Sequence, residues 1–157
     1  MIQNKIHFKE KDLPFMKIKC SVLVGGCFDV FHYGHLFFLE QAKEGAKCLI
    51  VLLESDEFIQ KRKHKKPVHT FSQRAEILSH IDIIDHIIVL PHIIDAKEYR
   101  YIVKMICPEV IAYSQGDPMV VQKKLCAKVV DARIKEIPYM KGFSSSLFYP
   151  YEISSRN

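Results

Sequence analysis

Two histidines behind a pair of glycines are the residues of this chain best suited to chemistry. They are His32 and His35, in the stretch VGGCFDVFHYGH over residues 24–35, and they follow Gly25 and Gly26. Glycine lets the backbone approach a ligand closely, and the free N–H groups at the start of a helix attract anions. Two imidazoles about one helical turn apart could donate hydrogen bonds to the negative charge that develops on a phosphoryl group during its transfer. The stretch therefore predicts a phosphate site, the alternative being that the histidines only cap a turn.

A strongly basic segment follows later in the chain. Five of the 23 Lys and Arg residues fall within residues 61–66, inside a non-periodic stretch over residues 54–70 that we predict to be a loop. Loops of this length usually carry function. Beside a phosphate site, such a segment favours contacts with substrate phosphates. A solvated charged loop is the alternative, and nucleic-acid binding, which would weaken steeply with salt, is the less expected one.

The elements that must position these residues alternate along the chain. Short apolar runs predict five strands, over Ile18–Val24, Cys48–Leu53, Ile87–Leu90, Val110–Tyr113 and Ile134–Pro138. Amphipathic segments between them predict helices over His35–Ala46, Ser72–Ile81, Lys97–Ile106 and Val120–Ala132. Such alternation is typical of βαβ units. We predict an α/β fold with a five-stranded parallel sheet, covered by helices on both faces, and a binding crevice at the carboxyl ends of the strands.

Length and composition indicate one domain. A chain of 157 residues, 48% of them hydrophobic, is long enough for a single sizeable core. We place the domain over residues 17–148, between an N-terminal extension over residues 1–16 and a C-terminal tail over residues 149–157. The five cysteines are odd in number and scattered, which favours a reduced, cytoplasmic protein. No apolar run reaches the length of a membrane span, so we expect none.

Three segments, taken in order, resemble the signature of a known enzyme family. They are GCFDVFHYGH over residues 26–35, the lysine-containing segment over residues 63–74, and KGFSSS over residues 141–146. Together they resemble the cytidylyltransferase-like nucleotidyltransferases, the superfamily with the HIGH motif, over residues 17–147. In length and layout the chain is similar to glycerol-3-phosphate cytidylyltransferase and to the adenylyltransferase domain that makes ADP-heptose. The resemblance implies a Rossmann-like domain and a homodimer.

The resemblance also implies a set of site residues. The catalytic residues, which would stabilise charge on the phosphates, are His32, His35, Lys63, Lys65 and Arg74. The nucleotide would be bound by Gly25, Gly26, Cys27, Phe28, Asp29, Gly34, Asp117, Ser144, Ser145 and Ser146. The acceptor substrate would be contacted by Lys66 and Asp85. Asp29 has two interpretations, a carboxylate near the Mg²⁺ of the triphosphate or a side chain that holds its loop and orients His32.

Two positions depart from the family pattern. Tyr139-Met140 stands where the cytidylyltransferases have Arg-Thr, so a guanidinium that binds phosphate is missing. Asp82 stands where they have a second arginine, which reverses the charge. The charge reversal at Asp82 weakens the case for glycerol 3-phosphate as the acceptor, and the missing arginine is the argument for a relative that only binds nucleotide.

These observations predict a nucleotidyltransferase. The phosphate of an acceptor attacks the α-phosphate of a nucleoside triphosphate in line and pyrophosphate leaves, with Mg²⁺ carried by the triphosphate. The first interpretation is a cytidylyltransferase that uses CTP and a polyol or amino-alcohol phosphate. The alternatives are an adenylyltransferase that uses ATP with a sugar 1-phosphate or FMN, and a degraded module that only binds nucleotide. Pyrophosphate release that requires both substrates would separate the enzyme from the module.

Overall fold

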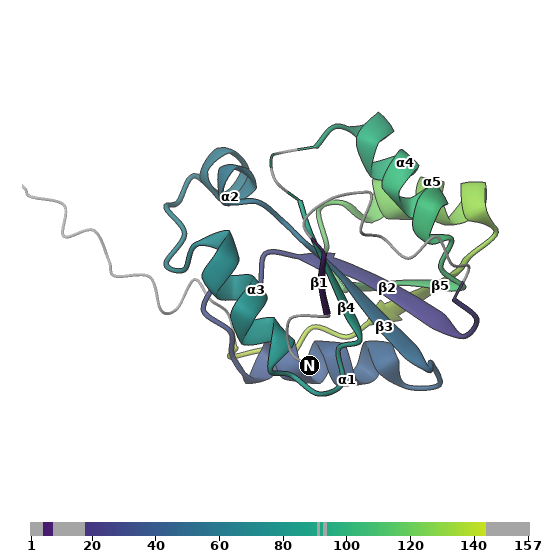
Figure 1. The fold of residues 1–157 in the computed structure, drawn as a ribbon, viewed down its shortest axis with the longest axis horizontal. Helices are drawn as coiled ribbons and strands as arrows, with labels where there is room; N and C mark the ends of the chain where they lie inside the picture. The colour runs from purple at the N-terminus through teal and green to yellow at the C-terminus, as the bar shows by residue number, and fades with distance from the viewer. Residues whose placement is uncertain (1–4, 8–17, 91, 93, 144–157) are drawn as a thin grey trace, which may run out of the picture.

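A parallel sheet forms the centre of the computed structural model, which describes residues 5–7, 18–90, 92 and 94–143 (Figure 1). The strands are β1 (Ile6–His7), β2 (Ser21–Gly26), β3 (Cys48–Leu53), β4 (His86–Val89), β5 (Val110–Ser114) and β6 (Arg133–Ile137). The helices are α1 (Tyr33–Lys43), α2 (Asp56–Lys63), α3 (Phe71–Ser79), α4 (Ala96–Ile106) and α5 (Val120–Val130). The strand order is β1-β4-β3-β2-β5-β6, with every pair parallel. The predicted single α/β domain is confirmed.

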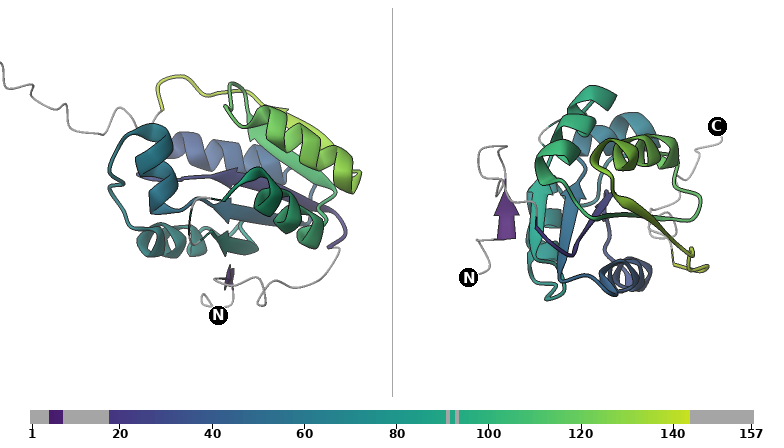
Figure 2. Two further views of the ribbon diagram at one scale, coloured as in Figure 1. Left: turned by 90° about the horizontal axis from the view of Figure 1, so that it is seen from above. Right: turned by 90° about the vertical axis from the view of Figure 1, so that its right-hand side faces the viewer.

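Helices cover both faces of the sheet, as predicted. α1 and α3 pack on one face and α4 and α5 on the other; in the right-hand view of Figure 2, α1 (blue) lies below the sheet and α4 and α5 (green) lie above it. Successive side chains of a strand point to opposite faces, so each central strand supplies both cores. All six residues of β3, CLIVLL, are buried for this reason. Across the ranges that the structure describes, each helix is too short or too polar to span a bilayer.

The order of the strands creates the crevice that holds the site. From β2 the chain proceeds to β3 and β4 on one side of the sheet, and then it crosses to β5 and β6 on the other side. The loops that follow β2 and β5 therefore turn in opposite directions, which leaves room for a ligand between them. Gly25 and Gly26 end β2 and Ser114 ends β5, so the glycine stretch lies at this switch point.

The sheet has six strands where the sequence predicted five. β1 lies at the edge beside β4, with Ile6 opposite Ile87 and His7 opposite Ile88, and it comes from the segment predicted as an N-terminal extension. Across this pair, His7 Nε2 and His86 Nδ1 lie 3.1 Å apart. A strand of two residues has too short an apolar pattern to be recognised in the sequence, and only its pairing reveals it.

The segment predicted as a loop contains α2. Ser55 caps this helix, because its Oγ accepts a hydrogen bond from the N–H of Phe58 at 3.1 Å. The first turn of the helix is acidic and the last turn is basic, an arrangement that complements the helix dipole. Only Ile59 is buried among its eight residues, so the sequence shows no apolar stripe there. The helix ends at Lys63 and thereby brings that lysine to the carboxyl edge of the sheet.

The cap of α2 can be tested by removing one hydroxyl. Ser55→Ala leaves the N–H of Phe58 without its acceptor, and we expect a loss of about 1 kcal/mol in the free energy of unfolding. Urea unfolding of the purified protein measures this change. The matched control is Ser72→Ala, an exposed position in α3, which should change stability by less than about 0.5 kcal/mol. Equal effects of the two substitutions would contradict the capping role.

Candidate active site

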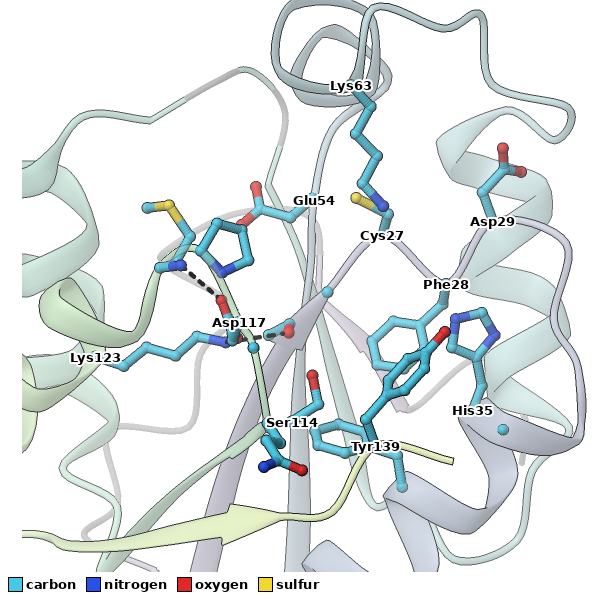
Figure 3. Close-up of a pocket in the computed structure, with 18 of the residues that line it drawn as sticks. Cys27, Phe28, Asp29, His35, Glu54, Lys63, Ser114, Asp117, Lys123 and Tyr139 are labelled. Atoms are coloured by element: carbon cyan, nitrogen blue, oxygen red, sulfur yellow. Dashed lines mark hydrogen bonds and ion pairs between the residues drawn. The ribbon is translucent and has the colours of Figure 1, made fainter. Parts of the chain in front are cut away.

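A pocket of about 350 Å³ opens at the carboxyl ends of the central strands (Figure 3). A volume of this size is typical of sites for small molecules. The structure brings ten of the predicted site residues together in its lining: Gly25, Gly26, Cys27, Phe28, Asp29, His32, Gly34, His35, Lys63 and Asp117. They come from the loop after β2, the start of α1, the end of α2 and the segment before α5. The pocket is therefore the candidate active site.

The histidine pair lies at the start of α1. His32 is the residue that caps the helix, and its imidazole stacks on that of His35 with ring centroids 3.8 Å apart. The Nδ1 of His35 accepts a hydrogen bond from the backbone N–H of His32 at 3.4 Å. The three-residue spacing thus places both rings on one side of the helix start, as predicted. They lie where the helix dipole is positive, which favours an anion in front of them.

Both imidazoles are neutral at pH 7. Burial is the main cause that lowers the pKa of His35 to about 3, and the neighbouring His32 and Lys63 lower it further. Burial likewise lowers the pKa of His32. Each neutral ring therefore offers a ligand one N–H donor and one unprotonated nitrogen as an acceptor. A triphosphate bound against the rings would favour their charged forms and so raise both pKa values.

Gly34, between the two histidines, is required for close packing. A Cβ at this position would lie 2.9 Å from the Cβ of Phe143 and 3.0 Å from the Cε1 of His32. Real Cβ atoms do not tolerate such contacts, so a larger residue would displace either the imidazole or the segment that lies over it. The glycine of this motif therefore maintains the position of His32.

Asp29 holds the long segment after α2. Its carboxylate is 3% exposed and accepts hydrogen bonds from the N–H groups of Val68 at 2.9 Å and His69 at 3.0 Å. Of its two predicted interpretations, these contacts support the one in which the side chain holds a loop. The loop it holds is not its own, however, but the one that follows α2.

Arg74 lies inside the scaffold and not in the pocket. Its side chain is completely buried, and the guanidinium donates to the carbonyl of Cys27 at 2.5 Å, to the carbonyl of His69 at 3.2 Å and to the carboxylate of Asp56 at 2.7 Å. All three partners belong to segments that surround the site. The structure therefore does not place Arg74 in contact with phosphates, and it corrects that prediction to a positioning role.

The basic residues after α2 do not act as one group. Lys63 lines the pocket and extends toward Cys27, as Figure 3 shows, whereas Lys65 and Lys66 lie outside the lining. Burial raises the pKa of the Cys27 thiol, although Lys63 opposes that effect. The thiol therefore stays protonated at pH 7 and is not a nucleophile.

Asp85 lies at the opposite edge of the sheet. It precedes β4, where its carboxylate pairs with Lys43 and accepts a hydrogen bond from the N–H of Leu49 at 2.7 Å. The amino ends of parallel strands face away from the crevice, so the structure does not bring this predicted substrate contact to the pocket. The other predicted residues not seen there, Ser144, Ser145 and Ser146, lie outside the described residues.

Several lining residues were not predicted from the sequence. They include Glu54, Tyr99, Ser114, Lys123, Tyr139 and Phe143. Glu54 directly follows a predicted strand, and this position could have indicated it. Tyr99 and Lys123 lie within ordinary amphipathic helices, where no local signal distinguishes a site residue from a core residue. Lys123 contacts Asp117, with Nζ and Oδ2 2.6 Å apart. The aspartate that lines the pocket is therefore already in an ion pair.

Glycines, a histidine pair and a lysine at the switch point of a parallel sheet define a nucleotide-binding α/β enzyme. Residues 23–147 match the family model described as cytidylyltransferase-like, and the chain belongs to this family of nucleotidyltransferases. It is 33% identical over 126 residues to FAD synthase of Thermococcus sibiricus, across 78% of this chain and 83% of the relative. It is 31% identical to the bifunctional protein HldE of Campylobacter jejuni, across 92% of this chain and 30% of the relative.

A solved structure supports the same fold. The lipopolysaccharide core biosynthesis protein from Thermoplasma volcanium superimposes with a TM-score of 0.60 at 20% sequence identity, over 76% of this chain and 95% of that one. Identity this low supports a shared fold and not a shared substrate. The family resemblance seen in the sequence motifs is thus confirmed by the family match and by the architecture.

The clamp made by Asp29 predicts a loop effect. Asp29→Asn turns an amide NH₂ toward one of the two N–H donors, at a side chain that is itself buried, so we expect stability to fall by about 1–3 kcal/mol. We also expect trypsin to cleave faster within residues 61–66. Urea unfolding and timed proteolysis measure these effects. Asp82→Asn, at an exposed position, is the control, and a cleavage rate equal to that of the control would contradict the clamp.

The partly buried His35 predicts that the fold is sensitive to acid. Its pKa in the folded state is about 3, below the ordinary value of 6.5, so the unfolded chain takes up a proton that the folded chain refuses. Its contribution is therefore full above about pH 6.5 and is lost as the pH falls toward 3. For a partly exposed ring we expect a loss of ~3 kcal/mol. Chemical unfolding of wild type and of His35→Gln at pH 7, 5 and 4 measures this loss. If the free energy of unfolding fell with pH in parallel for the two proteins, the prediction would be contradicted.

Proposed function

We propose that this chain transfers AMP from ATP to FMN and forms FAD and pyrophosphate. The observation that supports this most strongly is the similarity to FAD synthases of two Thermococcus species. They are 33% and 36% identical to this chain, and the match covers more than four fifths of their length. The pocket that the match includes carries the glycines, the histidine pair and Lys63. These relatives favour the ATP alternative of the sequence analysis over the first interpretation, which was CTP with a polyol phosphate.

The reaction needs no protein nucleophile. An oxygen of the FMN phosphate, already anionic at neutral pH, forms a new bond to the α-phosphorus of ATP. The bond from that phosphorus to the bridging oxygen breaks, and pyrophosphate leaves with the electron pair. What the protein must supply is an in-line arrangement and compensation for negative charge. This requirement agrees with the state of Cys27, whose thiol is buried and protonated in the pocket lining.

The start of α1 is the place for the α-phosphate in this proposal. There the N–H groups of the first turn, the imidazoles of His32 and His35, and the ammonium of Lys63 surround one region of the pocket. The imidazoles would donate hydrogen bonds to phosphate oxygens, and the approach of the anion would raise their pKa toward proton uptake. Charge stabilisation would thus increase as charge develops on the transferred group.

Mg²⁺ usually accompanies nucleoside triphosphates, bound mostly by phosphates and water. The carboxylate predicted near it, Asp29, is almost completely buried and accepts two backbone hydrogen bonds. Within the described ranges no group of three or more His, Cys, Asp or Glu side chains could hold a metal ion. In this proposal Lys63 and the start of α1 would compensate the remaining phosphate charge.

A second candidate acceptor is a sugar 1-phosphate. The observation in its favour is the match to HldE, which extends over 92% of this chain. That match covers only 30% of the relative, whose name describes two functions, so it supports the adenylyltransferase chemistry less directly. The same pocket residues would serve either acceptor, since both present a phosphate as the nucleophile.

The proposal is tested by product formation. Purified protein with Mg²⁺, ATP and FMN should form FAD and pyrophosphate in equal amounts, and neither product should appear when either substrate is omitted. His35→Ala should lower kcat by about 10²-fold, because a donor to the developing charge is lost. His80→Ala, at an exposed position after α3, is the matched control. Turnover with CTP or with a sugar 1-phosphate alone, or His35→Ala within about threefold of wild type, would overturn it.

A further inference from the structure

The wall of the pocket opposite the histidine pair has a different chemical character. Figure 3 shows Glu54, Asp117 and Lys123 on this side, across the pocket from His35 and Phe28. Tyr99 of α4 also lines the pocket, and its hydroxyl lies 3.8 Å from the position of a Cβ at Gly25. None of these residues belongs to the phosphate-binding motifs. We define this group of Glu54, Tyr99, Asp117 and Lys123 as the distal wall.

The distal wall is not built for phosphate. The ammonium of Lys123 lies 2.6 Å from the carboxylate of Asp117 and contacts the carbonyl of Gly25 at 3.5 Å. Its positive charge is therefore already paired within the protein. Burial is the main cause that raises the pKa of Glu54 to about 7; Asp117 raises it too, whereas Lys123, Arg74 and Lys63 oppose the shift. Much of this carboxyl is therefore protonated at neutral pH. An uncharged ligand group suits such a wall better than an anion does.

Two polar atoms of the distal wall have no hydrogen-bond partner. They are Oε2 of Glu54 and the hydroxyl of Tyr99, both buried, among the residues that the structure describes. Burial raises the pKa of Tyr99 as well, so this hydroxyl remains a donor. A buried polar atom without a partner costs free energy. Because both residues line the pocket, a bound ligand is a candidate partner for these atoms.

The geometry of a carboxyl group selects the ligand. A protonated carboxyl presents one donor beside one acceptor, and it pairs with a ring edge that places an acceptor beside a donor. The isoalloxazine of flavin has such an edge in its N3–H and adjacent carbonyl, and adenine has one in its amino group and N1. Phe58 and Met119 also line the pocket and offer apolar surface to a flat ring.

We propose that Glu54 and Tyr99 determine specificity by binding the uncharged, hydrogen-bonding ring edge of a substrate, while the phosphates lie at the histidine pair. For the reaction this inference rests on the proposed function, which supplies both flavin and adenine rings. The carboxyl acts as a combined donor and acceptor at this position. The Lys123–Asp117 pair supports the wall without contributing net charge.

Two phosphate-free probes, riboflavin and adenosine, test the wall separately from the phosphate side. Their binding to Glu54→Gln, Glu54→Leu and Tyr99→Phe is measured by flavin fluorescence and by calorimetry. Glu54→Leu should weaken binding of one probe by about tenfold or more, and Tyr99→Phe should weaken the same probe. Glu54→Gln, which keeps a donor beside an acceptor, should retain binding. The control is Glu76→Gln, at an exposed position on α3.

The pH profile separates a direct contact from a structural role. In wild type, binding of the affected probe should weaken as the pH rises from 6 to 8.5, because Glu54 loses its proton, whereas Glu54→Gln should show a flat profile. The other charged and titratable groups that act on Glu54 or line the pocket beside it are Lys123, Lys63, Arg74, Asp117 and Tyr99. A variant that only destabilises the fold would instead weaken binding of both probes, and its binding would keep the pH dependence of wild type.

The outcomes also distinguish this inference from the proposed function. If wild type forms FAD but no variant of Glu54 or Tyr99 changes binding of either probe, the distal-wall proposal is overturned and the function stands. If wild type forms no FAD while one probe still depends on Glu54, the function fails and the distal wall is supported. A selective loss of riboflavin assigns the wall to the acceptor, and a selective loss of adenosine assigns it to the nucleotide.

Discussion

The buried guanidinium of Arg74 is the interaction on which the geometry of the pocket depends. It connects the carbonyl of Cys27 after β2, the carboxylate of Asp56 in α2 and the carbonyl of His69 before α3. A fully buried charge is stable only when its hydrogen bonds are satisfied, so these segments are fixed relative to one another. Asp29 reinforces this arrangement, because its carboxylate accepts hydrogen bonds from two backbone N–H groups in the segment after α2. The position of the lysine at the end of α2 follows from this framework.

Within that framework the two sides of the pocket differ in chemical character: one side suits charged groups and the other suits uncharged polar groups. The side next to α1 combines a helix start, two imidazoles and Lys63, which together suit phosphates. The side next to α4 and α5 carries a closed ion pair, a tyrosine hydroxyl and a carboxyl whose pKa is raised to about 7 by burial. A substrate with a phosphate at one end and an uncharged ring at the other is complementary to both sides.

The sequence by itself determined the class of fold and the local arrangement of the histidine and glycine stretch. Alternating apolar and amphipathic segments require a covered parallel sheet, and the histidine and glycine spacing is local, so both were recognisable without a structure. β3 was recognised from its continuous apolar run and α1 from its apolar spacing, and both signals are local in the sequence. α2 was missed because only Ile59 is buried, and β1 because pairing and not composition defines it.

Only the tertiary structure decided which polar residues meet. Arg74 and Asp85 carry charges that suggested substrate contacts, yet one is buried under the pocket and the other lies at the amino edge of the sheet. Glu54, Tyr99 and Lys123 are separated by tens of residues and converge in one wall. The physical reason is that burial and long-range pairing depend on which ends of the strands and which helix faces come together. Local periodicity carries no information about those contacts.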